Sequence, residues 1–224
     1  RAEVAFAKND IKDLTKITGI FLPKFINKKL NKIFHKGSLE GEFIIPFESD
    51  GSIGKDYEFS GKMSDTSINL TKEFSIKKLT TEINHVKDGE SDEFKITIKK
   101  GSIYNIELAD SVINLKRTKN GTKVKSLLST KGELNFSQFK KISTLFAFNT
   151  SNLKDVNGKA DLKTNINFVL GKQFQIENLS YSMEGDIERM EIHTEERRII
   201  KEYLPDFDPQ IILKDTNVKF INSK

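Results

Sequence analysis

The chain has 224 residues, enough to bury a hydrophobic core, and it contains no cysteine, which excludes disulfides, thiolate nucleophiles and cysteine-ligated zinc. Apolar residues make up only 36% of the sequence and charged residues 31%, a balance typical of a thin sheet with one solvated face. The formal net charge is +5, but no arginine–aromatic interleaving accompanies it, so we interpret the lysines as a solvated surface and expect no nucleic-acid partner.

Two helices are predicted near the start of the chain. From Asp10 the apolar spacing is typical of a short helix. Pro23 then opens a second helix, predicted over residues 23–35 and ended by Gly37, with an apolar stripe opposite its lysines. A helix on a membrane surface is the alternative, but we interpret the stripe as covering the protein's own sheet.

The stretch from Gly37 to Met63 predicts a β-hairpin. Its first strand alternates strictly, and one face is made of Leu39, Gly41, Phe43, Ile45 and Phe47. In the second strand Tyr57 and Phe59 share a face with Gly61. The sequence Ser-Asp-Gly-Ser at positions 49–52 supplies the turn between them.

Shorter alternating runs follow up to Phe136 and predict an antiparallel meander. One short strand is expected at Ile68 and Leu70, separate from the strand before it. Residues 109–111 break the alternation, which predicts a turn or a bulge. The dipeptide Asn120-Gly121 is a strong hairpin signal and leads into one long strand.

A related pattern returns in the last third of the chain. A helix capped by Ser137 is predicted over residues 138–148, and a second hairpin follows whose apolar face includes Ile166, Phe168, Tyr181 and Met183. A helix is predicted over residues 195–204 and a final strand after it. The chain is therefore interpreted as two approximate repeat units, 9–136 and 137–224, of one segment from a longer, repeat-built protein.

The predicted fold is mainly β: an elongated, curved, groove-like antiparallel sheet with a few short amphipathic helices. The terminal strands are expected to form its open edges. No run of about 18 apolar residues is present, so no transmembrane helix is predicted, and any signal or anchor is expected outside this segment.

Catalytic chemistry is not indicated. The three histidines, His35, His85 and His193, lack the spacing of metal ligands. Two acid pairs, Glu107 with Asp110 and Glu188 with Glu191, fall in predicted turns or on outward faces. We therefore expect no enzyme activity, no catalytic residues, no metal and no cofactor.

Several motifs together resemble a known family. They are the helix ending in Lys36-Gly37-Ser38-Leu39-Glu40-Gly41, the strand from Tyr57 to Gly61, the segments Gly101-Ser102-Ile103 and Ala109-Asp110-Ser111-Val112, and Lys131-Gly132-Glu133-Leu134-Asn135-Phe136. In this order they resemble the C-terminal repeat region of the AsmA-like family of bacterial envelope proteins, which includes TamB and YhdP.

The resemblance implies a β-sheet groove in the periplasm, part of a protein anchored in the inner membrane, that carries phospholipid toward the outer membrane. The expected groove residues, which would contact phospholipid acyl chains, are Leu39, Phe43, Ile45, Phe47, Tyr57, Phe59, Ile166, Phe168, Tyr181 and Met183. Membrane association would come from segments outside this one, and other envelope proteins are expected as partners. The alternative is a structural or assembly factor for the outer membrane, including outer-membrane protein insertion, in which the same face is a closed core.

Overall fold

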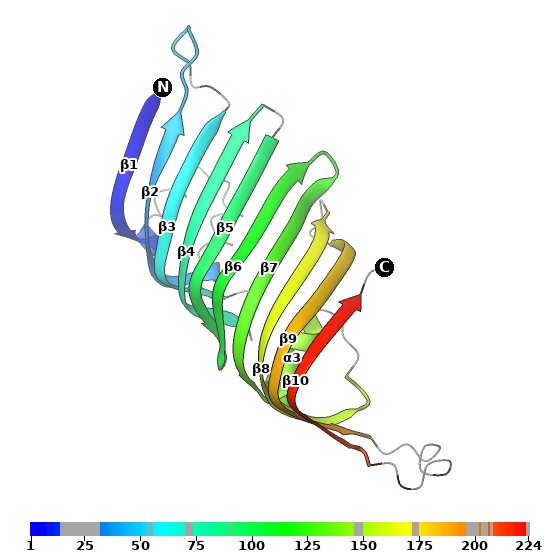
Figure 1. Ribbon diagram of the computed structural model, residues 1–224. Helices are drawn as coiled ribbons and strands as arrows, with labels where there is room; N and C mark the ends of the chain where they lie inside the picture. The colour runs from blue at the N-terminus through cyan, green and yellow to red at the C-terminus, as the bar shows by residue number, and fades with distance from the viewer. Residues whose placement is uncertain are drawn as a thin grey trace.

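The fold is a single ten-stranded antiparallel sheet in which strands adjacent in sequence are adjacent in space (Figure 1). The computed structural model describes residues 1–13, 32–52, 54, 56–69, 74–89, 91–145, 150–171, 175–195, 202, 206 and 208–222. The strands are β1 (Ala2–Asp10), β2 (Phe34–Ile45), β3 (Tyr57–Asn69), β4 (Ser75–Asp88), β5 (Ser91–Ile103), β6 (Ile106–Thr118), β7 (Gly121–Leu134), β8 (Leu153–Leu170), β9 (Ile176–Thr194) and β10 (Gln210–Asn222). This architecture confirms the predicted mainly-β, curved antiparallel fold.

The strands bend strongly along their length, so the sheet is curved, with one concave (inner) face and one convex (outer) face (Figure 1). Irregular backbone accompanies the bend: Asp65, Asp110 and Asp215 have φ angles of 46°, 46° and 44°. At Asp65 and Asp110 the pairing register also shifts, as expected of β-bulges. The bulge predicted at residues 109–111 is thus confirmed.

Each of these aspartates is followed by a hydroxyl residue that stabilises the distortion. Thr66 Oγ1 donates to the carbonyl of Ser64 at 3.3 Å, Ser111 Oγ donates to that of Ala109 at 3.0 Å, and Thr216 Oγ1 donates to that of Lys214 at 2.8 Å. Ser111 Oγ also accepts from the backbone N–H of Ser129 on the neighbouring strand at 2.8 Å. These side-chain bonds satisfy backbone groups that the broken ladder would leave unpaired.

The inner face of the bend holds the hydrophobic core. Its buried cluster consists of Ile11, Met63, Leu79, Ile98 and Leu108, each between 3% and 6% exposed. The sequence neighbours of these core residues point the other way: Lys62, next to Met63, and Lys99, next to Ile98, are exposed on the outer face. Ile11 follows β1 directly, and its side chain helps to close this part of the inner face.

The hairpin predictions are confirmed. β2 pairs with β3, β8 pairs with β9, and β6 turns into β7 at residues 119–120, all antiparallel. The separate strand predicted at Ile68 is wrong, because β3 continues through its bulge to Asn69; Leu70 lies outside the described residues.

Helix boundaries differ more from the predictions. Of the helix predicted over 23–35, residues 23–31 lie outside the described part, while Phe34 and His35 belong to β2, as does Gly37. The helix predicted over 138–148 is α3 (Phe136–Leu145), and residues 146–148 are not described. The predicted cap at Ser137 is wrong: Asn135 Oδ1 accepts from the N–H of Gln138 at 3.0 Å, and Gln138 Oε1 accepts from the N–H of Asn135 at 3.2 Å.

Most of the helix predicted over 195–204 lies outside the described residues. Helix α3 contacts β8 and lies inside the bend of the strands (Figure 1). The two edges of the sheet are β1 and β10, as predicted for the terminal strands. None of the helices in the described ranges is both long and apolar enough to cross a bilayer.

Candidate functional site

The strand register aligns a row of mostly apolar residues on the inner face that runs across eight strands. We call it the aromatic row; its members, from β1 to β8, are Val4, Phe43, Phe59, His85, Phe94, Leu115, Val124 and Phe168. Each member is the direct cross-strand partner of the next, so all of them share one face. With strands about 4.8 Å apart, the row is about 34 Å long.

Phenylalanine rings pack closely at the β1–β3 end of this row. The centroids of Phe43 and Phe59 are 4.6 Å apart, and the ring of Phe6 is stacked parallel to that of Phe59 at 6.5 Å. Opposed glycines make room for them, because a Cβ atom on Gly41 or Gly61 would lie within 3 Å of the Phe59 ring. The sequence thus places large rings next to residues without side chains.

Exposure varies along the inner face. Phe43 is 36% exposed and Val4 51%, whereas Val124 is 6% exposed. At the opposite edge Phe220 on β10 is 50% exposed, and its ring stacks on Tyr181 at 5.8 Å. The apolar surface is therefore most accessible toward both edges of the sheet, and between them half-buried positions such as Phe94 and Leu115 alternate with buried ones.

The structure brings most of the predicted groove residues onto one face. Direct pairing and the alternation along each strand place nine of them on the inner face: Leu39, Phe43, Ile45, Tyr57, Phe59, Ile166, Phe168, Tyr181 and Met183. Phe47 is the exception, because β2 ends at Ile45 and Phe47 lies beyond the strand, 48% exposed.

Sequence reasoning missed the centre of the row. The prediction used two separate hairpins, whereas Phe94, Leu115 and Val124 connect them across β5, β6 and β7. The signal was present, since each of these residues falls in an alternating run. Only the register across strands shows that they continue the same face.

A polar cluster begins at His85, a member of the row, and extends beyond the row on the same inner face. His85 Nε2 is 2.9 Å from Asp92 Oδ1, and Arg117 donates from Nη1 to Asp92 Oδ2 at 3.1 Å. His85 is only 7% exposed and stacks on Phe94 with centroids 3.5 Å apart, while Tyr57 meets its edge at 5.0 Å. Burial, and then the negative charge of Asp92, raise the pKa of Tyr57.

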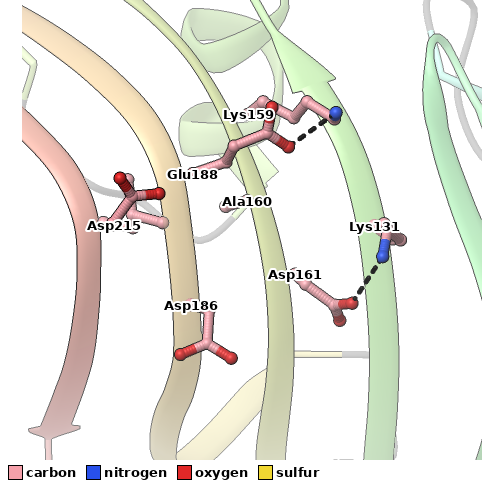
Figure 2. Close-up of a pocket in the computed structure, with 8 residues that line it drawn as sticks. Lys131, Lys159, Ala160, Asp161, Asp186, Glu188 and Asp215 are labelled. Carbon is pink, nitrogen blue, oxygen red and sulfur yellow. Dashed lines mark hydrogen bonds and ion pairs between the residues drawn. The ribbon is translucent and has the colours of Figure 1, made fainter.

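The outer face carries a different feature, a polar hollow of about 400 Å³ across β7 to β10 (Figure 2). Lys131 is paired with Asp161 at 3.1 Å, and Lys159 with Glu188 at 2.6 Å. The hydrogen bond to Glu188 raises the pKa of Lys159. Six of the eight residues that line the hollow are charged, and Ala160 and Ile187 are its apolar members.

One of the two acid pairs considered for catalysis, Glu188 with Glu191, is held by basic neighbours. Glu188 pairs with Lys159, and Glu191 accepts from Arg189 Nε at 3.0 Å. In the described part of the chain, no group of three histidine, aspartate or glutamate residues is placed to hold a metal ion.

Comparison with known proteins finds no matching family model, no matching curated protein and no matching solved structure. The functional interpretation therefore rests on the geometry of the inner face.

Proposed function

We propose that this chain is a non-enzymatic lipid-binding segment whose inner face holds phospholipid acyl chains. The observation that supports this most directly is the aromatic row, because it is continuous across eight strands and reaches both exposed and buried positions of one face. Acyl chains in one bilayer leaflet occupy about 15 Å, half of the hydrocarbon core, so the row of about 34 Å is long enough for a chain lying across the strands.

The energetics favour this occupant. Each methylene group taken out of water contributes about 0.8 kcal/mol, so a chain gains affinity from many small contacts without needing a deep cavity. Exposed rings at Phe43 and Phe220 provide such contacts at the two ends of the sheet. An exposed apolar surface on a soluble domain is otherwise unfavourable, and a lipid tail would cover it.

In its wider setting, we propose that the segment belongs to an AsmA-like envelope protein. There it would carry phospholipid between the inner and outer membranes through the periplasm. The anchor and any contact with other envelope proteins would come from parts of the protein outside this segment.

A second function has its own support. The cluster of Ile11, Met63 and Leu79 closes part of the inner face with the protein's own side chains. If the whole face were closed in this way, the segment would be a structural or assembly factor for the outer membrane, including outer-membrane protein insertion. The two functions differ in whether a ligand can reach the aromatic row.

Charge substitutions on the two faces distinguish these functions. Phe43→Glu places a carboxylate on the inner face at a position that is 36% exposed, and Leu127→Glu places one on the outer face at a position that is 40% exposed. Binding of a fluorescent fatty acid should fall about tenfold or more in Phe43→Glu, since the acyl chain would have to desolvate the charge. Leu127→Glu should bind as the wild type does.

Phe168→Glu tests the half-buried end of the row in the same assay, with thermal melting measured in parallel. Loss of fatty-acid binding with the fold retained supports a lipid groove. If Phe168→Glu instead loses both fatty-acid binding and its fold, while Phe43→Glu binds as the wild type does, the result would support the closed core.

A further inference from the structure

The cluster of His85, Asp92 and Arg117 stands out because charged side chains are costly on an apolar face. The side chain of Asp92 is 13% exposed, and both of its carboxylate oxygens have partners, one in His85 and one in Arg117. With Asp92 ionised, His85 donates from Nε2, because a carboxylate only accepts. His85 and Asp92 are therefore the buried part of the cluster, and Arg117 is its exposed part.

Arg117 is the part of this unit that faces solvent. Its side chain is 73% exposed, and only Nη1 is engaged with Asp92. A guanidinium has five N–H donors, so most of them remain directed away from this contact. The bond to the buried carboxylate restrains the guanidinium at one nitrogen, which reduces the entropy lost when it binds an oxyanion.

The local charge favours an anion. Lys87 is the direct cross-strand partner of Asp92, on the same inner face. Lys87 and Arg117 thus lie on the strands to either side of Asp92, and Tyr57 is the cross-strand partner of Lys87 on its other side. Lys87 and Arg117 carry two positive charges against the one negative charge of Asp92, and both oxygens of Asp92 already have partners. The net charge of these three residues is therefore positive.

Arg117 lies close enough to the aromatic row for one amphiphile to place its headgroup at Arg117 and its acyl chain on the row. Arg117 is two residues beyond Leu115 on the same face of β6, and two residues of a strand span about 7 Å. A group held by Arg117 would therefore lie next to an acyl chain on the row, toward the ends of the strands.

We propose that Arg117 and Lys87 bind the phosphate of an anionic lipid whose acyl chain lies on the aromatic row. This inference rests on the proposed lipid-binding function and adds to it a headgroup class. Arginine suits the task because its planar fork matches two phosphate oxygens at once. Asp92 is a positioning residue that holds the guanidinium, and His85, itself a member of the aromatic row, holds Asp92.

The test compares two amphiphiles with the same tail, dodecyl phosphate and dodecyl maltoside, each below its micellar concentration, on the purified chain. The wild type should bind the phosphate compound more tightly. Arg117→Gln should weaken that binding about tenfold, equivalent to about 1.4 kcal/mol, and leave dodecyl maltoside binding unchanged. Lys87→Gln should act in the same direction.

Lys116→Gln is the matched control. Lys116 is adjacent in sequence but lies on the outer face, where it forms a comparable exposed ion pair with Glu93 at 2.7 Å. It should leave the binding of both amphiphiles unchanged. Thermal melting of each variant shows whether the fold is intact, and Arg117→Lys, which keeps the charge, should retain part of the preference for phosphate even if Arg117→Gln is unstable.

Three results would overturn the inference. The first is an equal loss of both amphiphiles in Arg117→Gln, which would mean a structural role. The second is wild-type binding that does not distinguish the two headgroups. The third is binding of inorganic phosphate alone with the same dependence on Arg117, which would mean a free-anion site. If the wild type binds neither amphiphile, the proposed lipid groove itself fails.

Discussion

The phenyl ring of Phe59 lies over Gly61, two residues further along the same strand. A Cβ atom on Gly61 would lie 2.5 Å from Cζ of that ring, closer than any real contact allows. The ring also packs against the rings of Phe6 and Phe43 at the exposed end of the aromatic row. The absence of a side chain at Gly61 therefore decides where the ring sits.

A side chain at this position should displace the ring. Gly61→Val is expected to lower the free energy of unfolding by about 1–3 kcal/mol, the usual cost of overpacking, although valine suits a strand better than glycine. Urea unfolding measures the change. Ser60→Val, at the exposed neighbouring position on the outer face, should change stability by no more than about 0.5 kcal/mol. Equal stability in both variants would show that the ring is not held over Gly61.

A second prediction concerns Thr81 in the middle of the core. It is 1% exposed between its partners Met63 and Ile98, and its Oγ1 has no hydrogen-bond partner among the described residues. Thr81→Val keeps the shape and removes the unpaired hydroxyl, so it should stabilise the protein by about 1 kcal/mol. Thermal melting or urea unfolding would show the gain.

Thr66 is the matched control for this change. It is 0% exposed, but its hydroxyl donates to the carbonyl of Ser64 at the β3 bulge. Thr66→Val should therefore destabilise the fold by about 1 kcal/mol. If both threonine variants shift stability in the same direction, the hydroxyl of Thr81 is satisfied in solution.

The third prediction concerns pH. Burial and Asp92 raise the pKa of Tyr57, so the folded state holds the phenol proton more tightly than the unfolded state does. The stability gained is fully present below about pH 10, the ordinary tyrosine value, and is lost as pH rises through the raised pKa. Above about pH 10 the melting temperature of the wild type should therefore fall more steeply than that of Tyr57→Phe.

Ultraviolet absorbance gives the titration of the four tyrosines directly. One of them should titrate above the ordinary range, and this component should disappear in Tyr57→Phe. Asp92→Asn should lower the pKa of Tyr57 only in part, because burial is the main cause. An alkaline melting curve that is identical in the wild type and Tyr57→Phe would contradict the prediction.

Much of the sheet could be predicted from the sequence because its strands alternate cleanly. The hairpin from Leu39 to Met63 and the turn at Asn120-Gly121 are local signals, and both are confirmed. The continuation of β3 past Asp65 was missed, since a bulge shifts the alternation and makes one bent strand read as two. The recurring Asp-Thr or Asp-Ser pairs at 65–66, 110–111 and 215–216 were the available signal.

The candidate site could be predicted only in part. The inner face of each hairpin follows from period-2 alternation. The connection between the two hairpins through Phe94, Leu115 and Val124 depends on the pairing register of the four strands that lie between them. The polar cluster was missed for a similar reason. Asp92 and Arg117 are 25 residues apart, and only the pairing of β5 with β6 brings them together.

The most direct test of the lipid groove is mass spectrometry of lipids that co-purify with this chain from bacterial cells. The wild type and Leu127→Glu should each retain phospholipid, and Phe43→Glu should retain little while keeping its fold by thermal melting. Because Phe43 and Leu127 are similarly exposed on opposite faces, the difference reports which face the lipid occupies. A folded wild-type protein that carries no phospholipid, or equal retention in both variants, would contradict the account.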